Sequence, residues 1–185
     1  MEERLVVAGF GGQGVMAIGQ LLTYAGMIEN YNVSWLPSYG PEMRGGTANC
    51  SVIISGEAIG SPLVVESDSA IIMNKPSLDK FEKDVLPNGK LFIDSSLIDR
   101  KSSRNDIDVY YIPANEIANS LGNDKVSNMV MLGAYLEITN AVKVESVLKA
   151  FTKVFGERKA KFIPLNKEAL EKGAEAVKNQ RKVLV

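Results

Sequence analysis

Two stretches of this sequence carry residue types whose spacing suits the binding of an anionic ligand. In the first, Val6–Gly14, an apolar run leads into Gly9, Gly11, Gly12 and Gly14. Glycine tolerates positive φ and, because it has no Cβ, lets a phosphate come close to the backbone. A turn of this kind between a strand and a helix points backbone N–H groups along the helix dipole, which favours an anion.

The second stretch, Ser38–Gly46, places Glu42 and Arg44 among prolines and glycines. An arginine held by a rigid loop suits the recognition of phosphate or carboxylate. The structural alternative is a solvated Glu42–Arg44 pair, which contributes about 0–1 kcal/mol to stability. We expect the two stretches to lie side by side at the carboxyl edge of one sheet and to form one site.

Gly9 to Gly14 also satisfies the pattern G-x-G-x-x-G, which by itself suggests a dinucleotide. A nicotinamide-binding fold needs an acidic residue at the end of its second strand to bind the ribose, but here that strand ends at Leu36 and Pro37. Glu29 lies at a suitable distance in the sequence, but before the strand. The pattern therefore disfavours NAD, and the alternative that the glycines only let helix and strand pack closely stays open.

The composition excludes several kinds of chemistry. The chain has 185 residues, which suits a single domain over 1–185, and its 21 basic and 22 acidic residues give no electrostatic reason to expect nucleic acid. It contains one cysteine, Cys50, and no histidine. A four-thiolate zinc or iron–sulfur site and a histidine general base are thus excluded within this chain, and a lone cysteine suits a reducing cytoplasm. No apolar stretch predicts a membrane span.

The elements that must position the two loops follow from hydrophobic periodicity. Strands are predicted at Leu5–Ala8, Val33–Leu36 (ended by Pro37), Thr47–Ile54 with a hairpin return at Ala58–Ile59, Ser69–Met73, Lys90–Ile93 after a turn at 87–89, and Val109–Ile112. Helices are predicted at Gly14–Ile28, Pro76–Val85, Ala114–Leu121, Ser127–Thr139 (capped by Ser127 or Asn128), Val144–Phe155, and Leu165–Lys182 (capped by Asn166).

This alternation of strands and helices predicts an α/β fold. We expect a three-layer α/β/α sandwich with a mixed, mostly parallel, Rossmann-like sheet and a β-hairpin. Ligands of such folds bind at the carboxyl ends of the strands. Cys50 is predicted to be a small buried strand residue, and Trp35 a core residue.

Taken together, GFGGQGVMAIGQLLTYAG and SYGPEMRGGTANCSVIIS, followed by GSP and by NMVMLGA at Asn128–Ala134, resemble one family. They resemble the gamma subunit of the 2-oxoacid:ferredoxin oxidoreductases, which act on pyruvate, 2-ketoisovalerate or 2-oxoglutarate. They are also similar to the beta subunit of indolepyruvate oxidoreductase. The resemblance covers roughly Leu5 to Leu136, and Glu66–Ser69 departs from the Ala-Asp pattern of the family.

The resemblance implies a multi-subunit enzyme that decarboxylates a 2-oxoacid on thiamine diphosphate. Electrons pass through iron–sulfur clusters to ferredoxin, and the acyl group passes to coenzyme A. In this family thiamine diphosphate lies between the alpha and beta subunits, and the clusters lie in beta or in a ferredoxin-like delta subunit. The gamma subunit packs against alpha and helps to form the coenzyme A side of the site. By this resemblance the chain binds no cofactor alone, has no catalytic residue of its own and is inactive by itself.

The family motifs match this chain at ten positions. They are Gly9, Gly11, Gly12, Gln13 and Gly14 in the first loop, and Gly40, Glu42, Arg44, Gly45 and Gly46 in the second. The resemblance implies that they line the interface with coenzyme A, with Arg44 as an anion contact and Glu42 orienting either Arg44 or a group of the alpha subunit. Two other functions stay open: a free-standing nucleotide- or coenzyme A-binding module, and a purely structural subunit. Expressed alone, the chain is expected to self-associate, as a homodimer.

Overall fold

The computed structural model describes residues 1–38 and 47–183, and its centre is a six-stranded sheet with the order β2-β3-β1-β4-β5-β6. The strands are β1 (Glu2–Phe10), β2 (Asn32–Ser38), β3 (Thr47–Ser55), β4 (Ser67–Ile72), β5 (Val85–Asp94) and β6 (Asp108–Ile112). The α-helices are α1 (Val15–Ile28), α2 (Lys75–Phe81), α3 (Ala114–Ser120), α4 (Ser127–Thr139), α5 (Val144–Phe155) and α6 (Ile163–Val183). Short 3₁₀ turns are η2 (Glu82–Asp84), η3 (Asp124–Val126) and η4 (Glu157–Phe162).

The sheet is mixed because β3 runs against its two neighbours. β1, β4, β5 and β6 are mutually parallel, whereas β3 pairs antiparallel with both β1 and β2. The central strand β1 is covered on both faces, which explains its unbroken apolar run LVVA. The carboxyl ends of these four strands and of β2, which runs in the same direction, therefore share one edge of the sheet, where a ligand is expected.

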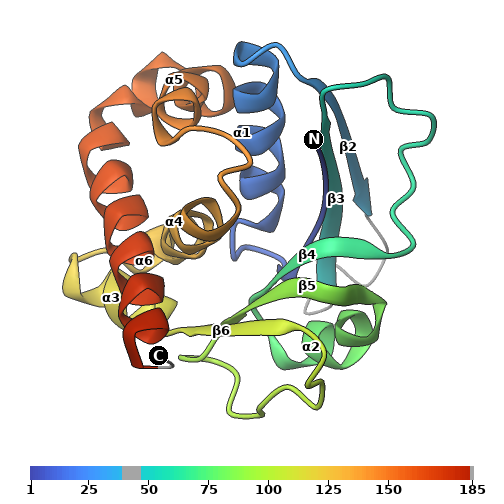
Figure 1. The fold of residues 1–185 in the computed structure, drawn as a ribbon. Coiled ribbons are helices and arrows are strands. Elements are labelled where there is room, and N and C mark those ends of the chain that lie inside the picture. The colour runs from blue at the N-terminus through green and yellow to red at the C-terminus, as the bar shows by residue number, and fades with distance from the viewer. Residues whose placement is uncertain (39–46, 184–185) are drawn as a thin grey trace.

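Helices cover both faces of the sheet, but unequally (Figure 1). α1, α4, α5 and α6 lie on one side with the larger hydrophobic cluster, and α2 lies on the other side over a smaller cluster that includes Ala8, Ala70 and Leu78. α4 is apolar almost all round because it is buried between the sheet and α6. The α/β fold predicted from the sequence is confirmed, with α2 as the thin third layer.

Glycines let α4 and α6 cross with their backbones in contact. A Cβ added to Gly133 would stand 2.0 Å from the carbonyl oxygen of Leu170, and one added to Gly173 would stand 1.9 Å from that of Val130. Neither distance is sterically possible, so both positions require glycine.

Two predictions about the antiparallel strands were wrong. β2 continues through Pro37 to Ser38, because β2 is the edge strand and the missing N–H of proline breaks no ladder there. Ala58 and Ile59 form no strand, so the hairpin return predicted for them does not exist. The consecutive antiparallel strands are instead β2 and β3.

The predicted turn at 87–89 and the two predicted helix caps, at Ser127 or Asn128 and at Asn166, were also wrong. The structure includes 87–89 in β5, where Asn88 has a φ of 64° and the pairing with β4 shifts register. Ser127 and Asn128 lie inside α4, whose N-cap residue is Val126. Asn166 is not the cap of α6 but lies within that helix, where its Nδ2 donates to the carbonyl of Phe162 at 2.8 Å. α2 ends at Phe81, short of the predicted Val85, because η2 and β5 follow directly.

Candidate functional site at the glycine turn

The turn between β1 and α1 is held in shape by the side chain of Gln13. Its Oε1 accepts a hydrogen bond from the N–H of Phe10 at 2.6 Å, and its Nε2 donates to the carbonyl of Met73 at 3.0 Å. The single amide thus joins the turn to the residue that follows β4. Gln13 acts as a brace of the loop, because both ends of its amide are engaged by the protein.

The glycines of this turn divide into two kinds. A Cβ on Gly9 would lie 2.7 Å from Gln13 Oε1, and one on Gly14, where φ is 80°, would lie 2.3 Å from Asn128 Nδ2. These two positions require glycine for packing. Gly11 and Gly12 are exposed, and a Cβ on Gly12 would have no atom within 4 Å. The packing interpretation therefore explains Gly9 and Gly14, while Gly12, with a φ of 91°, lines an open surface.

The N-termini of α1 and α4 meet at this turn. Gly14 is the N-cap residue of α1 and Val126 that of α4, and neither supplies a side-chain hydrogen bond. Within the described chain, the first turns of both helices contain no acidic residue. Asn128 joins the two ends, because its Oδ1 accepts from the N–H of Met129 at 2.9 Å and its Nδ2 lies 3.4 Å from the carbonyl oxygen of Gly14. Two positive helix ends at one place favour an anion.

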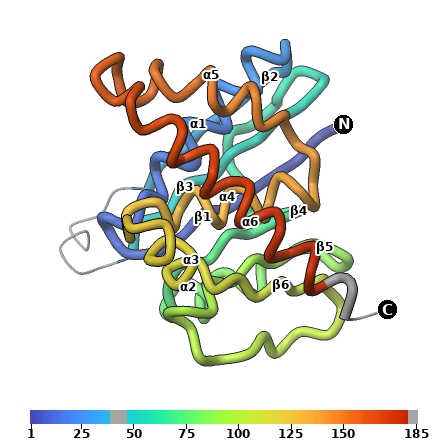
Figure 2. Tube along the Cα trace, turned by 90° about the vertical axis from the view of Figure 1, so that its left-hand side faces the viewer, coloured from blue at the N-terminus to red at the C-terminus, as the bar shows by residue number. Residues whose placement is uncertain are grey.

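Lys125 lines two hollows next to this junction. The smaller has a volume of about 200 Å³ and is bordered by Gly12, Gln13, Asn115, Asp124, Lys125 and Ser127. The larger, of about 380 Å³, begins at Gly14 and Ala17 and continues between α4, α5 and α6. Figure 2 shows the blue turn before α1 beside the yellow segment before α4. Sequence reasoning missed Lys125, because only tertiary packing brings η3 to the glycine turn.

The second predicted loop lies outside the described residues. This applies to Gly40, Glu42, Arg44, Gly45 and Gly46. β2 ends and β3 begins at the carboxyl edge, since Ser38 pairs with Asn49 and Thr47 pairs with Phe10. The chain thus leaves and re-enters the sheet beside the glycine turn.

Glu29, the acidic residue nearest in sequence to the position that a nicotinamide site needs, forms a structural hydrogen bond instead. Glu29 ends α1, and its Oε1 accepts a hydrogen bond from the N–H of Lys143 at 2.7 Å. This contact joins α1 to the start of α5, at the opposite end of α1 from Gly14. Glu29 is therefore a structural residue, which agrees with the sequence argument against NAD.

Two polar residues at the carboxyl edge were not singled out from the sequence. Asp94 ends β5 and is fully buried; its Oδ1 accepts from the N–H groups of Ser96 at 3.1 Å and Ala114 at 3.2 Å. Burial raises the pKa of this carboxyl, although these bonds oppose the rise. Asn74 follows β4 and caps α2 by accepting from Ser77 N at 2.9 Å. Both directly follow a buried apolar run, which is the signal that identifies them as residues of the edge.

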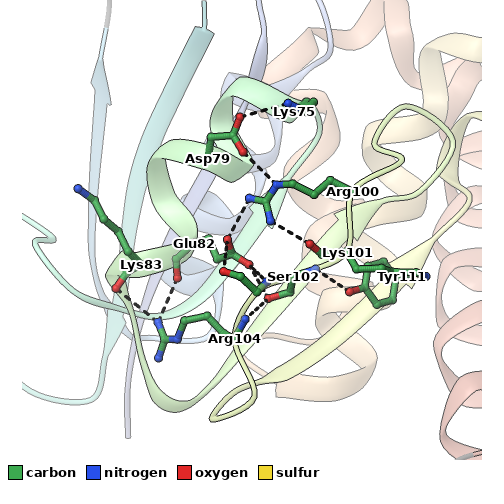
Figure 3. A network of polar contacts seen from close by, with 10 residues as sticks. Lys75, Asp79, Glu82, Lys83, Arg100, Lys101, Ser102, Arg104 and Tyr111 are labelled. Carbon is green, nitrogen blue, oxygen red and sulfur yellow. Dashed lines mark hydrogen bonds and ion pairs between the residues drawn. The ribbon is translucent and has the colours of Figure 1, made fainter.

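A separate cluster of charged side chains joins residues 99–106, which connect β5 to β6, to α2 and η2 (Figure 3). Glu82 is only 7% exposed and accepts from Arg100 Nη2 at 2.9 Å, Ser102 Oγ at 2.5 Å and Ser103 N at 2.7 Å. Burial alone would raise the pKa of Glu82, but the bonds from Ser102 and Arg100 outweigh it and hold that pKa below its usual value. Arg104 Nη1 donates to the carbonyl of Val85 at 2.7 Å. The acceptors here are satisfied by the protein, so the cluster stabilises the connection.

Cys50 and Trp35 lie as predicted in the packing against α1. Cys50 is fully buried, and burial raises the pKa of its thiol to about 11. A thiol with that pKa is unreactive at neutral pH. Trp35 is half-buried, and its Nε1 would lie 2.6 Å from a Cβ on Gly19. Among the described residues, no group of His, Cys, Asp or Glu is arranged to hold a metal ion.

The fold and the site together define an α/β protein with a glycine-rich turn between its first strand and first helix, at the carboxyl edge of a mixed sheet. A model of the family described as pyruvate ferredoxin/flavodoxin oxidoreductase matches residues 4–176, and the chain belongs to this family. The family expected from the two motifs is therefore confirmed.

Individual proteins show the same likeness. The ketoisovalerate oxidoreductase subunit VorA of Methanothermobacter thermautotrophicus is 41% identical over 175 residues, which cover 94% of this chain. The chain spans only 36% of the length of that relative. The gamma subunit of a keto/oxoacid ferredoxin oxidoreductase from Geobacter sulfurreducens has a similar structure, with a TM-score of 0.79 and 28% identity over 95% of this chain and 98% of that one.

A third protein shares the fold at lower identity. It is the 2-oxoglutarate:ferredoxin oxidoreductase of Magnetococcus marinus, solved with 2-oxoglutarate, coenzyme A and succinyl-CoA bound. The TM-score is 0.87 and the identity 22%, over 96% of this chain and 31% of that one. These relatives carry the names of oxidoreductases or of their subunits. In the described part of this chain, every helix is too short or too polar to cross a bilayer.

Proposed function

We propose that this chain is the gamma component of a 2-oxoacid:ferredoxin oxidoreductase and forms part of its coenzyme A site. The whole enzyme would oxidatively decarboxylate a 2-oxoacid to an acyl-CoA and pass the electrons to ferredoxin. The observation that supports this proposal most is that Gly14, the N-cap residue of α1, lines the same hollow as Lys125. An uncapped helix end and an ammonium group together suit the diphosphate of coenzyme A.

The composition supports a division of labour between this chain and its partners. With one buried cysteine and no histidine, the chain lacks the ligands of an iron–sulfur cluster and a histidine general base. Thiamine diphosphate and the clusters are thus assigned to alpha, beta and ferredoxin-like delta partners. This chain, as one gamma-type domain of a cytoplasmic complex, supplies the coenzyme A side of the interface. Arg44 is proposed as a second anion contact, with Glu42 orienting it.

The test is kinetic and uses the holoenzyme assembled from co-expressed subunits. Lys125→Ala should raise the KM for coenzyme A by roughly tenfold to hundredfold, because a hydrogen bond to a charged group contributes roughly 1.5–3 kcal/mol. Arg44→Ala should act in the same direction. The matched control is Lys149→Ala, because Lys149 is an exposed lysine of α5 that borders neither hollow. Its KM for coenzyme A should match that of the unaltered enzyme.

Each alternative function gives a different result. An unchanged KM for coenzyme A in both variants, with normal assembly, would favour a purely structural subunit. Affinity purification of the native complex tests the partners. Recovery of this chain alone, binding nucleotide or coenzyme A with no thiamine-containing chain attached, would favour a free-standing module instead.

A further inference from the structure

We infer that two copies of this chain pair through the open edge of β2, with α1 of one copy packed against α1 of the other. The fold covers one edge of the sheet and leaves the other uncovered. At β6, Gln180 of α6 engages the backbone of Tyr111, because its Oε1 accepts from the N–H at 3.1 Å and its Nε2 donates to the carbonyl. Within residues 1–38 and 47–183, no hydrogen bond reaches the backbone of β2 from outside the sheet. The backbone groups that β3 does not bond can therefore pair with another strand.

The surface around this edge carries almost no charge. Over the 24 residues of Val15–Ser38, which include α1 and β2, the one charged side chain is that of Glu29. The chain as a whole is 23% charged, so a stretch of this length would ordinarily carry about five. The carboxylate of Glu29 is itself bonded to the N–H of Lys143 at 2.7 Å. Edge strands are commonly protected by charges or by proline, but β2 has no charge, and Pro37 removes a donor only near its end.

α1 lies above the line between β2 and β3. A Cβ on Gly19 would stand 2.6 Å from Trp35 Nε1, in β2, and 2.7 Å from Cys50 Sγ, in β3. One on Gly26 would stand 2.6 Å from Val33 Cγ1, also in β2. Neighbouring strands are about 4.8 Å apart, so a twofold axis that pairs β2 with its copy would lie about 5 Å from α1, measured across the strands. The two α1 helices would then be about 10 Å apart, within the range of roughly 8–10 Å for packed helices.

The side of α1 that would face its copy is uncharged and only partly covered. α1 lies between α5 and the strands β2 and β3, and this side is turned away from α5 (Figure 1). Met16, Thr23 and Met27 share it at helical spacing, next to the side that the two glycines turn to the sheet. Met16 and Thr23 are half-buried, and Met27 is 55% exposed. One twofold contact would thus form the strand pair and cover this side of α1 together.

A second copy suits this surface better than an unrelated chain. In a twofold interface each residue near the axis meets its own counterpart, so any charge there would face its like. A surface without charges meets itself without that penalty. An antiparallel pair formed by a strand and its own copy also matches donors with acceptors in both directions.

The test measures the mass of the purified full chain by sedimentation equilibrium. The unaltered chain should have twice the 20.1 kDa of one copy. Thr23 lies between Gly19 and Gly26 and so above the middle of β2, where the two copies of Thr23 meet near the axis. Thr23→Glu and Thr23→Lys should each raise the dissociation constant of the dimer by roughly a hundredfold or more, because like charges then face each other. An equimolar mixture of the two variants should regain the dimer, which also shows that both fold.

Controls and hydrogen exchange complete the test. Thr152→Glu and Thr152→Lys, at a half-buried threonine of α5, should leave the mass unchanged. The N–H groups of β2 that β3 does not bond should exchange slowly in the dimer and fast in either Thr23 variant alone.

Each other outcome overturns the inference. A chain that is monomeric at every concentration leaves the edge of β2 to a different chain. A dimer that survives both Thr23 variants uses another surface, and one that the mixture fails to restore is not joined across a twofold axis at α1. A dimer restored by mixing but without slow exchange in β2 is held by helices alone, without the strand pair.

Discussion

The side-chain amide of Asn128 lies against the backbone of Gly14, with its Nδ2 3.4 Å from the carbonyl oxygen. The two residues are 114 positions apart in the chain, and this contact brings the starts of α1 and α4 together. The Cβ of any other residue at position 14 would stand 2.3 Å from that Nδ2. The geometry of the glycine turn and the stability of the fold thus depend on the same pair.

Replacing Gly14 should therefore destabilise the protein more than backbone strain alone explains. Gly14 and Gly122 have nearly the same φ, 80° and 81°, but a Cβ on Gly122 would have no atom within 4 Å. Gly122→Ala should lower the free energy of unfolding by the strain cost of about 1–2 kcal/mol. Gly14→Ala should cost clearly more, and Asn128→Ala should recover part of the excess in the double variant. Denaturant unfolding measures all four proteins; equal losses at the two glycines would contradict the clash.

Gln13→Glu should destabilise the turn because it replaces the Nε2 donor to Met73 with an oxygen. A buried or half-buried acceptor left without its partner costs about 1–3 kcal/mol. The loss should grow as the pH rises above about 4, because only the protonated carboxyl can donate to the Met73 carbonyl. Thermal unfolding between pH 4 and pH 8 checks this. Gln20→Glu, on the half-buried part of α1, serves as the control for adding a carboxylate.

Glu82 and its partners should make a pH-dependent contribution to stability. Because the folded protein lowers the pKa of Glu82, its contribution is present above the unfolded value of about 4.3 and is lost as the pH falls through the folded value. Glu82→Gln should therefore cost about 1.5–3 kcal/mol at pH 7, the usual size for a hydrogen bond to a charged group. The difference between the two proteins should shrink towards pH 3 in urea unfolding. Glu145→Gln, an exposed residue of α5, should show no such dependence.

Asp94 should behave in the opposite sense. Its pKa is raised by burial, so its ionisation opposes folding, and the penalty grows as the pH rises through the folded pKa. Asp94→Asn keeps the Oδ1 acceptor for Ser96 and Ala114 but removes the charge. The variant should gain stability relative to the unaltered protein between pH 4 and pH 8, by about 1–3 kcal/mol, the cost of a poorly satisfied buried group. A variant that loses stability across this range would show that the carboxylate is stabilised where it lies.

Much of the fold follows from sequence periodicity alone. The bounds predicted for α4, Ser127–Thr139, and for α5, Val144–Phe155, are those of the structure, because each has a strong apolar pattern with a clear stop, at Asn140 and Gly156. The wrong predictions concern tertiary context. Pro37 lies within β2 only because β2 is an edge strand, and nothing local in the sequence shows which strand is at an edge.

The candidate site was predictable only in part, because local motifs can be read from the sequence whereas tertiary contacts cannot. The first glycine loop is visible as a motif, and its place at the carboxyl edge follows from the strand that precedes it. Lys125, Asn166 and three phenylalanines of the larger hollow, Phe151, Phe155 and Phe162, come from segments that no local pattern links to position 14. Only the packing of α5 and α6 against α1 and α4 makes them neighbours.

The backbone contact between α4 and α6 has a consequence for ligand affinity. With Gly133 and Gly173 in direct contact with the opposite helix, α6 has one permitted position along α4. Leu165 and Asn166, which line the larger hollow, lie about 12 Å and about 10 Å from Gly173 along the same helix, at a rise of about 1.5 Å per residue. The width of the hollow is therefore set by glycines that do not line it. Changes at this crossing should tune the binding of the ligand at long range, through rigid displacement of a helix.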